Sequence, residues 1–193
     1  MGTLFSAVYN RFLGKVTDDM YLELTPADTV RDLQNLLIDA IPGFEFPRKD
    51  LDNFVVEIVE IGEEELVPDD FILGTVWEDL DEGTLNTIPH VLVDRSHFNV
   101  DLTSEEINIL ALLMKNSWVQ RQVTSIEHTR MKYSGSDFKM TSQANHLAKL
   151  MTLLNESKKE SLRAQRLYKR RKLVDGVYQS NWSCLRERSA IGN

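Results

Sequence analysis

Four histidines and one cysteine are the residues of this 193-residue chain whose types could support catalysis or metal binding. His90, His97, His128 and His146 include no pair three or four residues apart, so no two imidazoles share a helix face as zinc ligands do. Cys184 lies in no local signature that supplies the histidine a thiolate nucleophile needs. We therefore expect no enzyme, no metal and no cofactor.

Phosphate-binding and calcium-binding patterns are also missing from the sequence. The nearest candidate for a phosphate loop, Ser134-Gly135-Ser136, lacks the lysine that would reach the phosphates. Carboxylates gather at 63–65, 69–70 and 78–82, but without the spacing of an EF-hand loop. We interpret them as a solvated or docking face, with an acidic metal-dependent active site as a weaker alternative.

A dense run of cations follows from residue 158 to residue 172. At helical spacing the eight charges wrap much of the helix surface, and such a segment can neutralise phosphates, dock on an acidic protein or simply solubilise a helix end. Protein docking is the favoured interpretation. The residues are Lys158, Lys159, Arg163, Arg166, Lys169, Arg170, Arg171 and Lys172.

The charge of the chain is divided between its two parts. Residues 1–114 carry 24 Asp/Glu and 6 Lys/Arg, whereas residues 115–193 carry 6 Asp/Glu and 16 Lys/Arg. Complementary potentials orient partners and speed their encounter. The division therefore indicates a subunit that meets different partners at its two ends.

The clearest predicted elements are two long helices that position the cations. Thr103 to Glu106 forms a capping box, and a single apolar stripe from Ile107 to Tyr133 predicts a helix over about 104–132. A turn at 134–137 leads to a second helix that continues to Lys172, with Ala144, Leu147, Leu150, Met151 and Leu154 as its apolar face. Beyond these, only Leu162 and Leu167 remain for the seam, so we expect the end of the second helix to project or to contact another chain.

The N-terminal part predicts shorter elements. Apolar spacing favours helices over 3–13 and 25–41, and β-branched runs favour strands over 54–61 and 90–93, with a further short strand at 20–24. For the stretch 63–95 we expect loops with a short helix near 71–80. The predicted fold is mainly α: a long antiparallel helical hairpin with an N-terminal region of shorter helices and a small β element.

Three divisions follow from this pattern: an acidic N-terminal α/β-containing part (1–100), the long helical hairpin with its basic end (101–172) and an extended C-terminal tail (173–193). The tail keeps Tyr178, Trp182 and Leu185 among polar residues and glycines. Apolar anchors of this kind insert into a partner or pack back on their own chain.

Several stretches resemble the neck proteins of tailed bacteriophages. They are Phe98 to Ala111 (FNVDLTSEEINILA), the run through Trp118 to Gln122, Tyr133 to Leu147 (YSGSDFKMTSQANHL) and Ile41 to Arg48 (IPGFEFPR). The resemblance covers residues 20–155 in patches. It identifies the chain as similar to head–tail connector (adaptor) proteins.

This resemblance implies a virion structural protein of the neck, assembled in the host cytoplasm. Such adaptors form a ring, usually dodecameric, that joins the portal to a downstream neck or tail protein. The ring extends the channel through which genomic DNA passes without sequence-specific binding. The C-terminal segment Lys158 to Asn193 would then lie at the portal, and no membrane is involved. The alternative is a nucleic-acid-binding regulatory protein that uses the basic helix 158–172.

Overall fold

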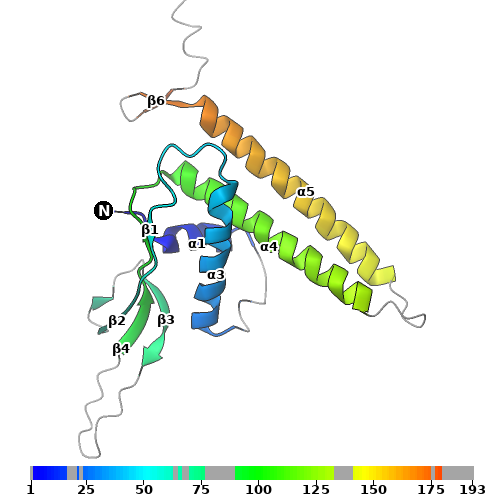
Figure 1. The fold of residues 1–193 in the computed structure, drawn as a ribbon, viewed down its shortest axis with the longest axis horizontal. Coiled ribbons are helices and arrows are strands. Elements are labelled where there is room, and N and C mark those ends of the chain that lie inside the picture. Colours follow the sequence, from blue (N-terminus) through cyan, green and yellow to red (C-terminus); the bar gives the residue numbers. More distant parts are fainter. Residues whose placement is uncertain are drawn as a thin grey trace, which may run out of the picture.

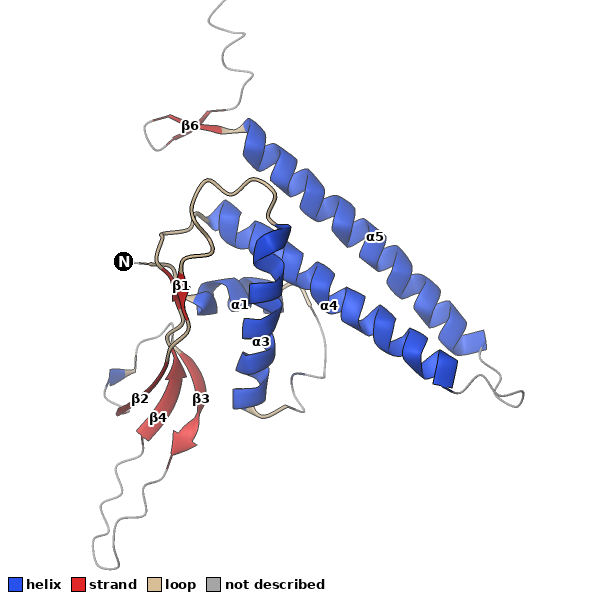
Figure 2. Ribbon diagram, viewed as in Figure 1, coloured by secondary structure: helices blue, strands red, loops and turns tan. Residues whose placement is uncertain are grey.

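The described part of the chain in this computed structural model comprises residues 2–16, 21, 24–62, 65–66, 70–76, 90–132, 141–174 and 177–179. Two long helices run side by side, two shorter helices lie against one of them, and a small sheet extends on the side away from the second long helix (Figures 1 and 2). The expected mainly α fold with a long antiparallel hairpin is confirmed.

The two shorter helices are α1 (Phe5–Leu13) and α3 (Pro26–Ala40), and α3 is continued by the 3-10 turn η1 (Ile41–Gly43). The Thr25 hydroxyl accepts a hydrogen bond from the Asp28 backbone N–H at 3.2 Å, and Pro26 occupies the first helical position. Both helices bury one apolar side against the first long helix. The expectations of helices at 3–13 and 25–41 are confirmed to within a few residues.

The first long helix, α4 (Ser104–Lys132), begins at the predicted capping box. The Glu106 backbone N–H donates to the Thr103 hydroxyl at 3.3 Å, and the Thr103 backbone N–H donates to the Glu106 carboxylate at 2.7 Å. Each residue therefore satisfies a backbone donor that the start of a helix leaves unpaired.

The N-terminal half of α4 is the centre of the core and is buried in every direction. Six consecutive residues are at most 8% exposed, and they span more than one full turn. They are Ile109, Leu110, Ala111, Leu112, Leu113 and Met114. The prediction of one apolar stripe is therefore wrong here, because α1, α3, η1 and the second long helix enclose α4 from different sides.

The second long helix, α5 (Thr141–Arg170), packs along α4 through a seam that changes character along its length. Leu147 and Leu154 are 7% exposed and form an apolar cluster with Val119 and Val123. Met151, predicted for the same face, is 46% exposed and faces away.

Toward its C-terminus the α5 seam is polar. It consists of Ser157, Ser161, Gln165 and Tyr168, each at most 2% exposed. Leu162 and Leu167 are 38% and 42% exposed, so their predicted place in the seam is wrong. The end of α5 does not project either, because it contacts its own chain: Tyr168 binds Glu106, and Lys169 lies over the Phe46 ring.

The small sheet is antiparallel, with the strand order β2 (Ile58–Gly62), β4 (His90–Asp94) and β3 (Phe71–Val76). The expected strand at 90–93 is confirmed. The run at 54–61 divides into β1 (Phe54–Val55), which pairs with β5 (His97–Phe98), and β2. The helix expected near 71–80 is wrong over 71–76, because those residues form β3. Most of the strand expected at 20–24, and the turn at 134–137, fall outside the described residues.

Candidate protein-docking surface

Four of the predicted cations form one straight row on α5. Lys159, Arg163, Arg166 and Arg170 follow one another at steps of four, three and four residues, which keeps them within about 60° of the helix circumference. All four are exposed. The eight cations of 158–172 therefore do not simply wrap the helix, since half of them share one direction.

The row lies on the side of α5 opposite to the seam. Ser161 and Gln165, which face α4, are separated from the row by about half of the helix circumference. None of the four cations forms an ion pair with a carboxylate among the described residues. Their charge is thus directed outward and is not neutralised by the described part of the chain.

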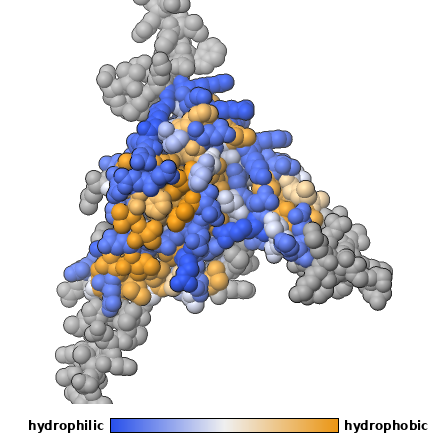
Figure 3. Space-filling view, in the orientation of Figure 1, coloured by the Kyte–Doolittle hydropathy of each residue, from blue (hydrophilic) through white to orange (hydrophobic). Residues whose placement is uncertain are grey.

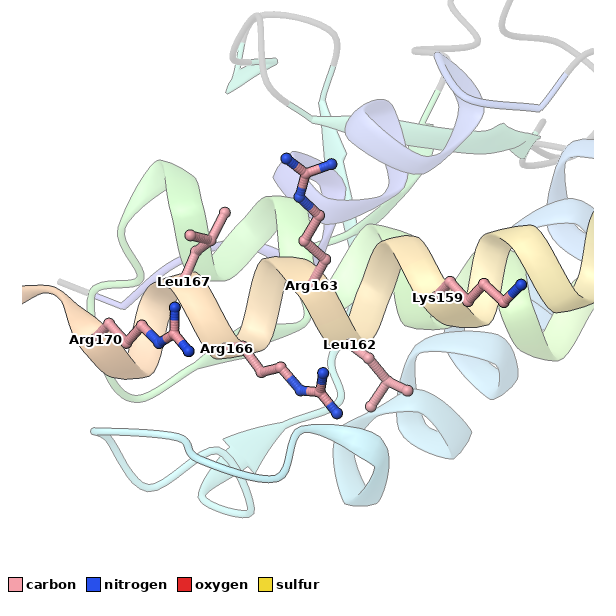
Figure 4. A pocket seen from close by; sticks show the side chains of 6 residues that line it. All are labelled: Lys159, Leu162, Arg163, Arg166, Leu167 and Arg170. Atoms are coloured by element: carbon pink, nitrogen blue, oxygen red, sulfur yellow. The ribbon is translucent and has the colours of Figure 1, made fainter.

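Two leucines flank the row and complete the surface. Leu162 and Leu167 line a shallow depression together with the four cations, and Figure 4 shows Leu162 beside Arg166 on one edge of the row and Leu167 beside Arg163 on the other. We call these six residues the α5 outer face. Arginine beside exposed leucine is typical of protein interfaces, where the guanidinium binds carboxylates and the apolar groups lose contact with water.

Three other predicted cations have partners within the chain. Arg171 contacts Glu105 at 3.0 Å, Lys169 lies 3.8 Å from the centre of the Phe46 ring, and Lys158 donates to the Gln120 side chain at 3.3 Å. These contacts tie α5 to α4 and to the loop after η1. The three residues therefore have structural partners that the sequence pattern did not indicate.

The remaining predicted partner-binding residues lie beyond α5. Lys172 begins β6 (Lys172–Val174), and Tyr178 lies in β7 (Val177–Gln179), where it is paired with Leu173. Trp182 and Leu185 lie outside the described residues. The structure thus brings together four of the eleven predicted residues and adds Leu162 and Leu167 to them.

A buried carboxylate fixes the end of α5 and so orients the outer face. Glu106 is 2% exposed and accepts hydrogen bonds from the Tyr168 hydroxyl at 2.5 Å and from Lys49 at 3.2 Å, in addition to its capping bonds. Burial raises the pKa of Glu106, but hydrogen bonds from Thr103, Tyr168 and Lys49 outweigh it, so the pKa lies below its usual value. Burial and the same carboxylate raise the pKa of Tyr168.

The loop after η1 clamps the last turns of α5. The Gln165 amide accepts a hydrogen bond from the Glu45 backbone N–H at 2.8 Å and donates to the Gly43 carbonyl at 3.2 Å. Arg48 donates to the Tyr168 carbonyl at 2.7 Å, and the same carbonyl accepts from the Arg171 backbone N–H at 3.2 Å, so the loop binds the end of the helix directly. The row is therefore held on a rigid element.

The described residues hold no group of three or more His, Cys, Asp or Glu that could bind a metal ion. Within the same residues, no helix is both long enough and apolar enough to cross a membrane. In comparisons with known proteins, no family model, no curated protein and no solved structure matches this chain.

Proposed function

We propose that this chain is a structural subunit of a bacteriophage neck. In this proposal several copies form a ring that joins the portal vertex to the tail and extends the DNA channel. The resemblance of four stretches of the sequence to head–tail connector proteins motivates it.

The observation that carries the proposal is the α5 outer face. It is an exposed row of four cations with two leucines, rigidly mounted on a chain of net charge −8. In a monomer these cations would only solubilise the helix and the leucines would stay exposed to water, whereas a subunit of an assembly gains a surface for an acidic partner.

Nucleic-acid binding is the competing explanation for the same row. Four cations in line could neutralise phosphates, and such binding weakens steeply as salt rises. Two features favour a protein partner: the exposed Leu162 and Leu167 offer nothing to phosphates, and the excess of carboxylates over the rest of the chain repels DNA. Repulsion of this kind suits a channel through which DNA slides.

The experiment is the mass of the purified chain by light scattering, alone and mixed with the portal protein of the same phage. A chain that ends at Gln179 keeps every described residue, so it tests the tail with Trp182 and Leu185 without removing Tyr168 or Gln165 from the core. A deletion from residue 158 onward would remove those core residues and confuse loss of docking with unfolding.

The proposal expects the full chain to join the portal in several copies, and the chain ending at Gln179 to bind it more weakly. If the full chain stays a single copy beside the portal, the neck proposal is refuted. Binding of duplex DNA whose affinity falls with salt would then favour the nucleic-acid alternative.

A further inference from the structure

We infer that the α5 outer face of one copy docks on the β2 side of the small sheet in a second copy of this chain. The β2 side consists of the exposed residues Val55, Val56, Glu57, Ile58 and Glu60. The inference rests on the proposed ring and names the contact that builds it. The portal would then bind elsewhere, through the C-terminal tail.

Within the part of the chain that the structure describes, the β2 side of the sheet is another uncovered apolar surface. Val55, Val56 and Ile58 are 40%, 49% and 55% exposed. Figure 3 shows apolar surface gathered on the side of the molecule where the sheet lies. Within the described residues, β2 pairs only with β4, so its other edge has no partner strand. Sheet edges of this kind are ready to pair or must be covered.

The two surfaces have opposite charge. Glu57 and Glu60 are exposed among the β2-side apolar residues, whereas Arg163 and Arg166 lie among the leucines of the α5 outer face. The two surfaces are therefore complementary: both have apolar groups to cover, and their charges have opposite signs.

One copy cannot satisfy both surfaces by itself. Figure 1 places α5 and the sheet on opposite sides of the molecule, with α1, α3 and α4 between them. A contact between two different surfaces of identical subunits is head-to-tail, and repetition of such a contact closes into a ring when the rotation allows it. The arrangement thus suits the ring that the proposed function requires.

The test uses two charge-reversed proteins. Variant A carries Lys159→Glu, Arg163→Glu, Arg166→Glu and Arg170→Glu, so its α5 outer face is acidic, like its unchanged β2 side. Variant B carries Glu57→Lys and Glu60→Lys, so both of its surfaces are basic. A control carries Arg31→Glu and Lys149→Glu, exposed cations outside the α5 outer face, and so reverses charge without touching either proposed contact surface.

Association is measured by light scattering for each protein alone, for an equimolar mixture of A and B, and for each of these with the portal. Like charges across the contact should weaken self-association of A and of B by about 100-fold or more, and the control should associate like the wild type. The mixture should recover assembly, because every contact between A and B pairs an acidic surface with a basic one.

The inference is overturned if variant A assembles like the wild type, if variant B does, or if the mixture of A and B fails to assemble. In each of these cases a wild-type ring on the portal would leave the proposed function standing. A wild-type chain that stays a single copy, alone and with the portal, would refute the proposed function itself. A circular-dichroism melt of each variant checks that it is folded.

Discussion

The hydrogen bond between Tyr168 and Glu106 is the contact whose removal tests most directly how the end of α5 is held. Tyr168→Phe deletes one hydroxyl and keeps the ring, which packs against Phe44 with ring centres 5.5 Å apart. The hydroxyl is the only group of α5 that donates to the Glu106 carboxylate among the described residues. The substitution therefore removes one interaction without opening a large cavity.

The expected loss is large for a single oxygen atom. Both residues are at most 2% exposed, and a hydrogen bond to a charged group contributes about 1.5–3 kcal/mol. Lys49 and Thr103 still donate to Glu106 in the variant, which keeps the loss near the middle of that range. We expect the free energy of unfolding to fall by about 2 kcal/mol.

Urea unfolding followed by circular dichroism measures this loss. With a slope of about 2 kcal/mol/M, the midpoint should fall by about 1 M while the slope stays the same. Tyr21→Phe is the matched control: its hydroxyl donates to Asp32 at 3.1 Å in a partly exposed setting where Arg121 also binds Asp32, and its loss should be about 0.5 kcal/mol.

A double-mutant cycle with Glu106→Gln separates this bond from general damage. We expect a coupling energy of about 1 kcal/mol or more, because the two groups touch directly. Equal midpoints for the wild type and Tyr168→Phe, or a coupling energy near zero, would refute the claim that this carboxylate fixes α5.

Three further predictions concern the same core. Since hydrogen bonds lower the pKa of Glu106, its contribution to stability should be complete above the unfolded-state pKa of about 4.3 and should be lost as the pH falls through the folded-state value; Glu106→Gln should flatten this part of the pH profile of urea unfolding. Ser157→Ala removes a buried hydroxyl that has no hydrogen-bond partner among the described residues, and it should leave the melting temperature unchanged or raise it. Ser161→Leu, in contrast, should overpack the seam and destabilise the fold by about 1–3 kcal/mol. Gly2→Ala places a Cβ against the Phe98 carbonyl and should lower the melting temperature by displacing the N-terminal segment.

Local rules identified the elements whose signals lie within a few consecutive residues. The capping box at Thr103 and Glu106 located the start of α4, and Thr25 with Pro26 located the start of α3. These signals are strong because the bonds they predict involve neighbours in sequence. They need no knowledge of what packs where.

The misassigned seam of α5 had a different cause. Helical-spacing rules assign apolar residues to the buried face and therefore selected Leu162 and Leu167. The structure buries Ser157 and Ser161 instead. Serines fit there because α4 already provides an apolar core, and because long-range contacts such as the Gln165 bonds to the η1 loop offset the loss of apolar burial. A partner 120 residues away cannot be read from local spacing.

The β3 strand was missed for a related reason. Phe71 to Val76 is short and apolar, and periodicity alone does not separate a short buried strand from a helix segment. The pairing with β4, which includes a register shift between Ile72 and Gly74, is what fixes the choice. Sequence spacing likewise placed Lys159, Arg163, Arg166 and Arg170 on a helix, but only the packing of α5 reveals that they face outward together.

The polar seam and the exposed leucines are two consequences of one arrangement. Had Leu162 and Leu167 faced α4, α5 would be turned by a large part of its circumference and the four cations would no longer lie together on the side opposite to α4. The hydrogen bonds of Gln165 and Tyr168 fix the rotation of α5 about its own axis, because a hydrogen bond depends more strongly on direction than apolar burial does. The leucines are thereby left for a partner. This arrangement predicts that Leu162→Ala leaves the urea midpoint unchanged and weakens assembly, whereas Tyr168→Phe lowers the midpoint and leaves the α5 outer face chemically intact. If Leu162→Ala lowered the midpoint as much as Tyr168→Phe, the leucine would belong to the fold and not to an interface.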